Sequence, residues 1–203
     1  FSSASPYVRK VMVVAQEAGI ADRIEKLPSA ANPVNHDRTI VPHNPTGRVP
    51  TMILPDGSAL FDSRVICEYL DGLHDGPPML PVAGPERLRV LTLNALADGL
   101  MEAAILVRYE LVVRPEPYRW EGWIEGQWSK VTASVTALEA DFVDHLEANV
   151  DLGAIATACA LGWIDFRFPD RDWRPPAPRL AAWFARFAGR PSMLATKPSA
   201  PPA

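Results

Sequence analysis

Apolar positions near the start of the chain recur with the spacing of a helix: Val8, Val11, Met12, Ala15 and Ala18. Ser5 followed by Pro6 predicts the helix start, because a serine hydroxyl caps free N–H groups and proline suits the first helical position. Gly19 supplies the stop. The pattern therefore predicts a first helix between Ser5 and Gly19.

The following stretch changes from extended segments to a helix. Residues 20–46 are expected to hold a short strand and an irregular loop, and strands at 51–54 and 59–61 flank the turn sequence Pro-Asp-Gly-Ser as a hairpin. A helix follows from Ser63 to about Leu73, with one apolar face formed by Val65, Ile66, Tyr69 and Leu70. The order β-α-β-α-β-β-α is thioredoxin-like. It requires residues before Phe1 to complete a first strand, and we expect such residues to exist.

The rest of the chain is predicted to be helical. The sequence Gly-Pro-Pro-Met-Leu-Pro at 76–81 is a stiff connector and the best domain boundary. Helices are expected beyond it at about 85–113, 117–148, 152–166 and 178–188. The prediction is an α/β thioredoxin-like domain over residues 1–76 and an all-α domain over residues 82–203.

Composition narrows the classes of function. Hydrophobic residues make up 48% of the 203 residues, which supports a real core. The net charge of −4 offers no basic face for nucleic acid, and no run of about 18 uninterrupted apolar residues predicts a membrane span. Cys67 and Cys159 fall in apolar helical patterns, so buried free thiols and a reducing compartment are expected. The four histidines show no metal-ligand spacing, so no metal is expected.

The most informative motif is the run Asn-Pro-Thr-Gly-Arg-Val-Pro-Thr-Met-Ile-Leu at 44–54, followed by Phe-Asp-Ser-Arg at 61–64. Pro50 belongs at the first residue of a strand or at an edge, because it lacks an N–H. The Val49–Pro50 bond is a candidate cis peptide, which would expose the Val49 backbone to a visiting peptide. Asp62 and Ser63 open a helix whose free N–H groups and positive dipole end suit a carboxylate. Together these features fit glutathione, a peptide with an α-amino acid head.

Two further stretches complete a family pattern: Ser-Ser-Ala-Ser-Pro-Tyr-Val-Arg-Lys-Val at 2–11 and Ala-Leu-Gly-Trp-Ile-Asp-Phe-Arg at 160–167. In this order the motifs resemble the glutathione S-transferases, most closely the bacterial serine-type branch of the cytosolic enzymes, and the likeness covers nearly the whole chain. The resemblance implies the glutathione transferase fold, glutathione as co-substrate, no metal, and a cytoplasmic homodimer that acts in detoxification.

Thiol activation is expected to fall to a serine. Ser5 offers both a hydroxyl and the positive end of the first helix, and each favours the thiolate over the thiol. Ser2 is the second candidate, because other serine-type classes carry their catalytic serine at its place. Ser5-Pro6-Tyr7 also resembles the Cys-Pro-Tyr start of glutaredoxins, but without the cysteine the chain cannot form its own mixed disulfide. The alternative is that Ser5 is only a helix cap.

The resemblance also implies the glutathione contacts. Val49, before Pro50, should offer its backbone to the cysteinyl part of glutathione. Asp62 should face the γ-glutamyl amine, and Ser63 should bind the neighbouring carboxylate. Arg48 is a candidate for the glycine carboxylate, and a solvated loop arginine is an equal alternative. For Val49 the alternative is an ordinary strand start, and for Asp62 and Ser63 it is a plain N-cap.

The electrophile pocket is expected between the domains, walled by Tyr7 and by a helix face that carries Met101, Ile105, Arg108 and Tyr109. In the family, the helix before the Gly162-Trp163 segment starts with a capping box. Here Asp151 can cap, but the reciprocal acid is absent at Ala154, which puts the stability of that helix in mild doubt.

The leading hypothesis is a transferase that activates the glutathione thiol for attack on small apolar electrophiles. One alternative is glutathione-dependent reduction of peroxides or disulfides. Another is a non-catalytic interaction protein similar to the stringent starvation protein, which associates with RNA polymerase. Retention of Val49-Pro50 and Asp62-Ser63 argues against the second alternative, because an adaptor has no need of these residues.

Overall fold

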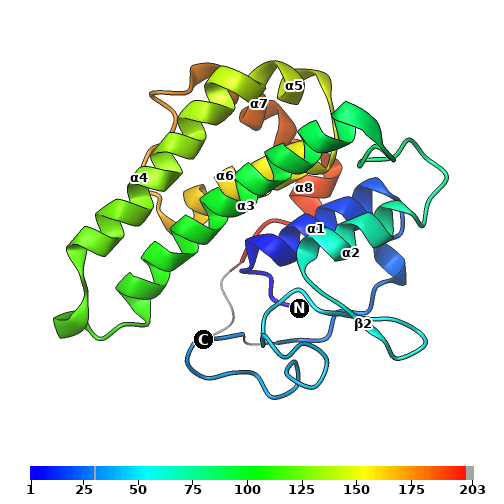
Figure 1. The fold of residues 1–203 in the computed structure, drawn as a ribbon, viewed down its shortest axis with the longest axis horizontal. Helices are drawn as coiled ribbons and strands as arrows, with labels where there is room; N and C mark the ends of the chain where they lie inside the picture. Colours follow the sequence, from blue (N-terminus) through cyan, green and yellow to red (C-terminus); the bar gives the residue numbers. More distant parts are fainter. Residues whose placement is uncertain (30, 200–203) are drawn as a thin grey trace. The chain divides into compact units, whose positions relative to one another are not determined.

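The computed structural model describes residues 1–29 and 31–199, which form two compact units (Figure 1). One unit comprises Phe1–Val82 together with the segment that begins at Arg190, and the other comprises Ala83–Gly189. The segment after Arg190 thus joins the first unit, whereas the sequence analysis placed it in the helical domain. Ion pairs from Arg190 to Glu17, at 2.8 and 2.9 Å, hold it there.

The first unit is built on helix α1 (Pro6–Glu17), which begins as predicted. The Ser5 hydroxyl accepts the N–H of Val8 at 3.3 Å, and Pro6 occupies the first helical position. The helix packs against α2 (Ser63–Asp71) and α8 (Pro191–Ala195) and is followed by the short turn η1 (Ala21–Arg23). Packing on two sides explains why every residue from Val8 to Ala15 is buried.

The sheet of the first unit is smaller than predicted. Strands β1 (Met52–Ile53) and β2 (Ala59–Leu60) pair antiparallel with Met52 opposite Leu60, which confirms the predicted hairpin. No strand is formed at Phe1 or in the described part of 20–46. Instead, the Phe1 amine donates to Leu27 and the Ser29 N–H donates to Phe1, the bonding pattern of parallel strands. These two hydrogen bonds form a single bridge, so the two segments do not make an extended strand pair.

Turns replace the helix that the thioredoxin-like order places before the hairpin. Between Asp37 and Asn44 the chain forms short backbone bonds, such as His43 N–H to Ile40 C=O at 2.8 Å. The Asp37 carboxylate supports them by accepting the N–H and hydroxyl of Thr39 at 2.9 and 2.6 Å. This segment is the irregular loop that its Asn and Pro content predicts.

The second unit contains the long helix α3 and a set of helices that pack on it. Its elements are α3 (Gly84–Val112), η2 (Glu116–Tyr118), α4 (Glu121–Ala137), η3 (Leu138–Phe142), α5 (Val143–Ala148), α6 (Leu152–Arg167) and α7 (Pro178–Phe187). The single helix expected at 117–148 is therefore interrupted. The element η3 is a π-helical turn between α4 and α5, and only its first residue, Leu138, is buried.

Helix α6 forms the core of the second unit. Every residue from Leu152 to Leu161 is buried, and Figure 1 shows α6 beside α3, with both helices running in the same direction. A Cβ atom added at Gly153 would lie 2.8 to 3.0 Å from side-chain atoms of Leu93, so this glycine allows the close approach. The two residues also fix the register of the helix pair.

The start of α6 has a partner that the sequence analysis missed. Asp151 caps the helix by accepting the Ala154 N–H at 2.9 Å, as predicted. Its other carboxylate oxygen lies 2.6 Å from His145 Nε2, a contact that orients the capping side chain.

Helix α3 is also the one helix in the described residues that is long and apolar enough to cross a membrane, with a mean hydropathy of 1.6 over its best window. Half of that window is buried inside the protein. Packing against both α4 and α6 accounts for this composition, since core helices carry the same residues.

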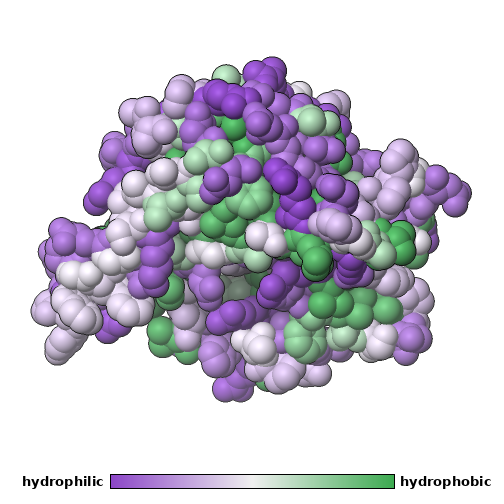
Figure 2. Space-filling view, turned by 45° about the horizontal axis from the view of Figure 1, so that its top comes forward, coloured by the Kyte–Doolittle hydropathy of each residue, from purple (hydrophilic) through white to green (hydrophobic). Residues whose placement is uncertain are grey.

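One face of the molecule carries mainly hydrophilic residues (Figure 2). Figure 2 shows hydrophilic residues over much of one face, with hydrophobic residues in separated groups. Cys67 and Cys159 are buried and are not joined in a disulfide, as predicted. Within residues 1–29 and 31–199, no group of three or more His, Cys, Asp and Glu residues is arranged to hold a metal ion.

Candidate functional site

Asn44 organises the loop that precedes strand β1. Its side chain is buried, and its Oδ1 accepts the Thr46 N–H at 3.0 Å and the Thr46 hydroxyl at 2.7 Å. Its Nδ2 donates to the Arg48 carbonyl at 3.2 Å and to the Thr51 hydroxyl at 3.0 Å. One buried amide therefore ties both sides of Val49–Pro50 to the same point. The sequence analysis included Asn44 in the motif but gave it no role.

The Val49–Pro50 peptide bond is cis, which confirms the prediction. Val49 is half-buried next to β1. Among the described residues, its N–H and C=O form no hydrogen bond with another part of the chain. Both groups are therefore open to pairing with an extended peptide.

The start of α2 supplies the second half of the candidate site. Asp62 is the N-cap and accepts the Arg64 N–H at 2.9 Å. The Arg64 guanidinium also bonds the other carboxylate oxygen at 3.0 Å. Ser63 is the first helical residue and is buried, with 2% exposure. The Phe61–Asp62 bond is also cis. The first N–H groups of α2 remain outside the helical bonding pattern, and they suit an anion.

Asp62 is held in its charged form. Partial burial acts to raise its pKa, but the hydrogen bonds from Arg64 and the positive charges of Arg64 and Lys10 outweigh burial, so the pKa lies below its usual value. At neutral pH this position therefore carries a negative charge that can attract an ammonium group.

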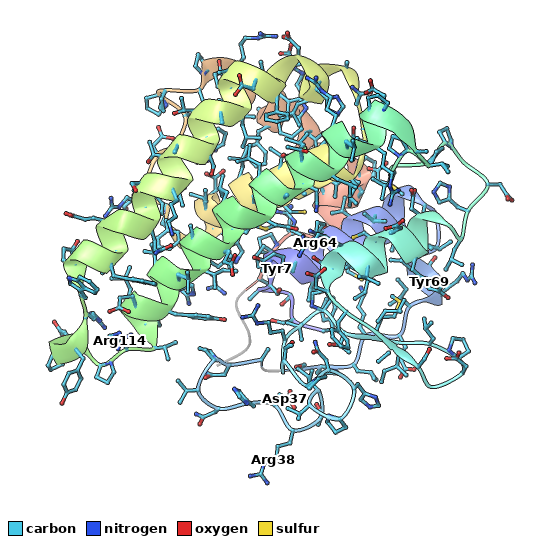
Figure 3. The ribbon with its side chains drawn as sticks, viewed as in Figure 1. Tyr7, Asp37, Arg38, Arg64, Tyr69 and Arg114 are labelled. Carbon is cyan, nitrogen blue, oxygen red and sulfur yellow. The ribbon has the colours of Figure 1, made fainter. Side chains whose placement is uncertain are left out.

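Lys10 is a charged residue of this region that the sequence analysis did not single out. It is fully buried in α1, which is rare for a lysine. Its ammonium lies 5.8 Å from the centroid of the Tyr7 ring. Figure 3 shows Tyr7 in the first turn of α1 and Arg64 in the first turn of α2, the two helices that pack together. The signal in the sequence was a cation inside an apolar run from Val8 to Val14.

Ser2 and Ser5 lie together in the turn that leads into α1. The Ser5 N–H donates to the Ser2 carbonyl at 3.1 Å, and the Ser5 hydroxyl accepts from Val8. A serine hydroxyl that accepts one hydrogen bond still has its own proton to donate. Capping and donation to a thiol are therefore compatible roles for Ser5.

The remaining predicted residues differ in accessibility. Arg48 is exposed on its loop, and Tyr7 is half-buried in the first unit. In the second unit, Met101 is fully buried, Ile105 and Arg108 are half-buried, and Tyr109 is 38% exposed. Of the four residues predicted on α3, Met101 is therefore the one closed to solvent, and the electrophile pocket stays a prediction.

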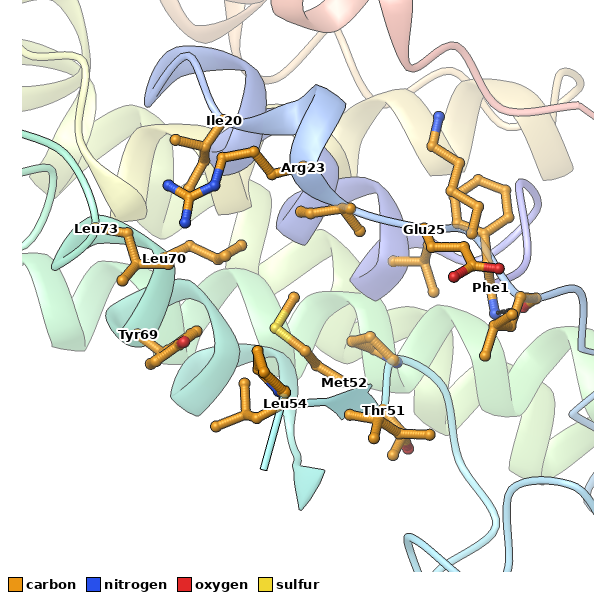
Figure 4. A pocket seen from close by; sticks show the side chains of 17 residues that line it. Phe1, Ile20, Arg23, Glu25, Thr51, Met52, Leu54, Tyr69, Leu70 and Leu73 are labelled. Carbon is orange, nitrogen blue, oxygen red and sulfur yellow. Dashed lines mark hydrogen bonds between the residues drawn. The ribbon is translucent and has the colours of Figure 1, made fainter. Parts of the chain in front are cut away.

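A cavity of about 510 Å³ lies elsewhere on the first unit (Figure 4). It is bordered by Phe1, by extended segments at 24–27 and 51–54, by Leu70 of α2 and by Leu73 just after that helix. Pro50 is the one predicted site residue in its lining. The candidate glutathione site lies outside this cavity, because charged helix-start residues and open backbone groups suit glutathione better than a gap between two extended segments.

Comparison with known proteins identifies the family of the chain. The model of the glutathione S-transferase N-terminal domain matches residues 4–73, and that of the C-terminal domain matches residues 121–186. The GST-like protein YibF of Escherichia coli is 35% identical over 200 residues, which cover 97% of this chain and 96% of that protein.

Solved structures are similar over the full length. A glutathione transferase family member from Pseudomonas fluorescens Pf-5 with bound glutathione has a TM-score of 0.97 and 47% identity, covering 98% of each chain. A second structure from that bacterium, with bound S-(propanoic acid)-glutathione, has a TM-score of 0.92 and 46% identity over 98% of each chain. The chain therefore belongs to the glutathione S-transferase family.

Proposed function

We propose that this protein is a glutathione transferase that binds glutathione at the Val49 loop and the start of α2, and that activates its thiol through Ser5. The observation that carries the proposal is the pairing, within one unit, of an ordered loop with open backbone groups and a charged helix start. The relatives from Pseudomonas fluorescens, crystallised with glutathione or a glutathione conjugate, support the same ligand.

Each part of glutathione has a matching partner. The cysteinyl backbone would pair with the N–H and C=O of Val49, as one strand pairs with another. The γ-glutamyl carboxylate would bind the Ser63 hydroxyl and N–H at the positive end of α2. Its ammonium would join Arg64 at the Asp62 carboxylate, and Arg48 would meet the glycine carboxylate from its exposed position.

Ser5 would lower the pKa of the bound thiol by donating its proton to the sulfur. A thiol near pKa 8.5 is ionised to only a few per cent at pH 7, so a decrease of about 2 units supplies ~2.7 kcal/mol toward the thiolate. The thiolate then attacks an electrophilic carbon and forms a C–S bond. The leaving group departs, or the resulting carbanion takes a proton from solvent, while the thiol proton is released.

Conjugation is favoured over reduction by one observation. S-(propanoic acid)-glutathione, bound by the Pseudomonas relative, has the C–S bond of a conjugation product, whereas reduction would end in a glutathione disulfide. A non-catalytic role is disfavoured by the full-length similarity to glutathione-bound transferases.

Retention on a glutathione matrix tests the binding site. The double variant Asp62→Ala/Ser63→Ala should lose retention, because it removes the carboxylate and the hydroxyl at the start of α2. The matched control is Asp56→Ala/Ser58→Ala, the same two chemical changes in the exposed hairpin turn of the same unit. If the first variant is retained as well as the control, the glutathione site lies elsewhere.

Titration of bound glutathione, followed by thiolate absorbance, tests the activating serine. Ser5→Ala should raise the thiol pKa by about one unit, equivalent to ~1.4 kcal/mol, and Ser2→Ala by less. The reverse order would give the role to Ser2 and leave Ser5 as a cap. If neither variant moves the pKa, backbone N–H groups activate the thiol.

A further inference from the structure

Residues 190–199 form a segment that runs back along α1 in the opposite direction. At the last residue of α1, the Glu17 carboxylate accepts two bonds from the Arg190 guanidinium, at 2.8 and 2.9 Å, and such a paired contact fixes geometry. Nearer the helix start, the Arg9 guanidinium donates to the Met193 carbonyl at 3.2 Å in a buried bond. Figure 1 shows α8, which belongs to this segment, beside α1. The segment therefore leads toward the start of α1.

Beyond α8 the segment meets the turn that precedes α1. The Ser3 hydroxyl donates to the Ser199 carbonyl at 3.3 Å, and the Ser199 hydroxyl donates to the Ser3 hydroxyl oxygen at 2.9 Å. The two serines thus form a reciprocal pair although they are 196 residues apart in the chain. Ser3 is half-buried and Ser199 is exposed. This pair joins the far end of the segment to the turn before α1.

Ser3 has a central position in that turn. The Ser5 N–H donates to the Ser2 carbonyl at 3.1 Å, which closes a β-turn with Ser3 and Ala4 in the middle. The two candidate thiol activators, Ser2 and Ser5, are therefore the two ends of one turn. The backbone angles of the central residues of a β-turn set where its ends lie. A contact that anchors Ser3 therefore limits the movement of the two hydroxyls relative to one another.

We propose that the segment 190–199 is a clamp along α1 that holds the Ser2–Ser5 turn in place for thiol activation, with Ser3 and Ser199 as positioning residues. The proposal rests on the proposed function. A hydroxyl favours the thiolate only while it keeps a good donor geometry to the sulfur, and a donor that is already ordered does this best. Loss of the clamp should therefore raise the pKa of the bound thiol without removing a group that holds the peptide.

Titration of bound glutathione, followed by thiolate absorbance, tests the clamp. Ser3→Ala removes both bonds of the pair and should raise the thiol pKa by about 0.5, which lowers the thiolate fraction about threefold at pH values below the pKa. Ser199→Ala removes one of the two bonds and should raise the pKa by less. Ser199→Thr keeps the hydroxyl and should give the pKa of the unchanged protein.

A double variant separates a positioning role from a direct one. If Ser3 acts through Ser199, the variant Ser3→Ala/Ser199→Ala should raise the thiol pKa no further than Ser3→Ala alone, because the single change already breaks the pair. Effects of the two substitutions that add together would mean that the serines act independently, which would overturn the clamp.

Two controls make the result specific to the pair. The Thr196 hydroxyl donates to the Ser192 carbonyl at 2.8 Å, a bond within the segment, so Thr196→Ala should leave the thiol pKa unchanged. S-methylglutathione has no thiol and should bind Ser3→Ala as tightly as it binds the unchanged protein in calorimetry, because the residues proposed to hold the peptide are intact.

The outcomes distinguish this proposal from the one on which it rests. An unchanged thiol pKa in Ser3→Ala, with a raised pKa in Ser5→Ala, would overturn the clamp alone. If Ser2→Ala and Ser5→Ala both leave the pKa unchanged, activation by serine fails, and the clamp fails with it. Loss of S-methylglutathione binding in Ser3→Ala would assign the pair to peptide binding, which would also overturn the clamp.

Discussion

The candidate glutathione site and the α3–α6 pair are held together by different forces. In the loop at 44–51 a buried amide bonds to backbone and hydroxyl groups. Along α3 and α6 the helices approach closely through Gly153 and Leu93, and most of α6 is buried. Polar side chains thus position one region, whereas shape and burial position the other.

This difference separates binding from stability. A hydrogen bond to a loop orders a few residues, so its loss should mainly weaken the ligand that needs them in place. Loss of fit between two core helices affects a close-packed interior that cannot relax fully. Substitutions in the loop should therefore lower glutathione affinity, and substitutions in the helix pair should lower the free energy of unfolding.

The largest effect is expected from Gly153→Val. The new side chain would overlap Leu93, including its Cβ, so the helices must separate, and the free energy of unfolding should fall by about 2–3 kcal/mol in denaturant titration. Gly99→Ala is the control, because a Cβ at this exposed α3 position meets nothing within 4 Å. It should stabilise by about 0.5–1 kcal/mol. Equal destabilisation by both substitutions would contradict the close-contact explanation.

The next effect should come from Asn44→Ala. Without the amide, the Arg48 carbonyl and both threonines lose bonds that hold the Val49 loop. Glutathione affinity in calorimetry should fall about tenfold, or ~1.4 kcal/mol. Asn32→Ala, which removes a half-buried asparagine from a turn in the same unit, should leave affinity unchanged. A large loss of stability with unchanged glutathione affinity would contradict the contrast drawn between this loop and the α3–α6 pair.

A smaller effect is expected at the start of α6. Asp151→Ala removes the cap and the His145 partner, and should lower the free energy of unfolding by about 1 kcal/mol. Asp151→Asn keeps an oxygen that can accept the Ala154 N–H, so thermal unfolding should show a smaller loss. If both variants unfold alike, the ion pair with His145 matters more than the cap.

The smallest effect is expected in the dependence of protein stability on pH. Hydrogen bonds from Arg190 oppose the burial of Glu17 and lower its pKa below the ordinary 4.5. Its stabilising contribution should therefore be complete above that value and be lost as pH falls through the lower, folded-state pKa. Glu17→Gln should destabilise the protein by about 0.5–1 kcal/mol at neutral pH. The difference in free energy of unfolding between this variant and the unchanged protein should vanish at low pH. A difference that stays constant across pH would mean that it comes from packing.

Local signals in the sequence determined the helix starts at Ser5-Pro6, Asp62 and Asp151, the hairpin, most helix bounds and the cis Val49–Pro50 bond. Neighbouring residues alone decide caps, turns and periodicity, so one sequence is enough for them. The hydrogen bonds of Asn44 join residues only a few positions apart in the chain. Which groups the amide bonds to depends on the burial of its side chain, which the sequence does not show.

Only the tertiary structure decided the contacts between distant residues. The burial of Lys10 between packed helices, the pairing of Arg190 with Glu17 and the contact of Gly153 with Leu93 each depend on segments far apart in the chain. Periodicity indicates that a face is buried but not which helix covers it or in what register. The charges and side chains that meet across such contacts became visible only once the helices were packed.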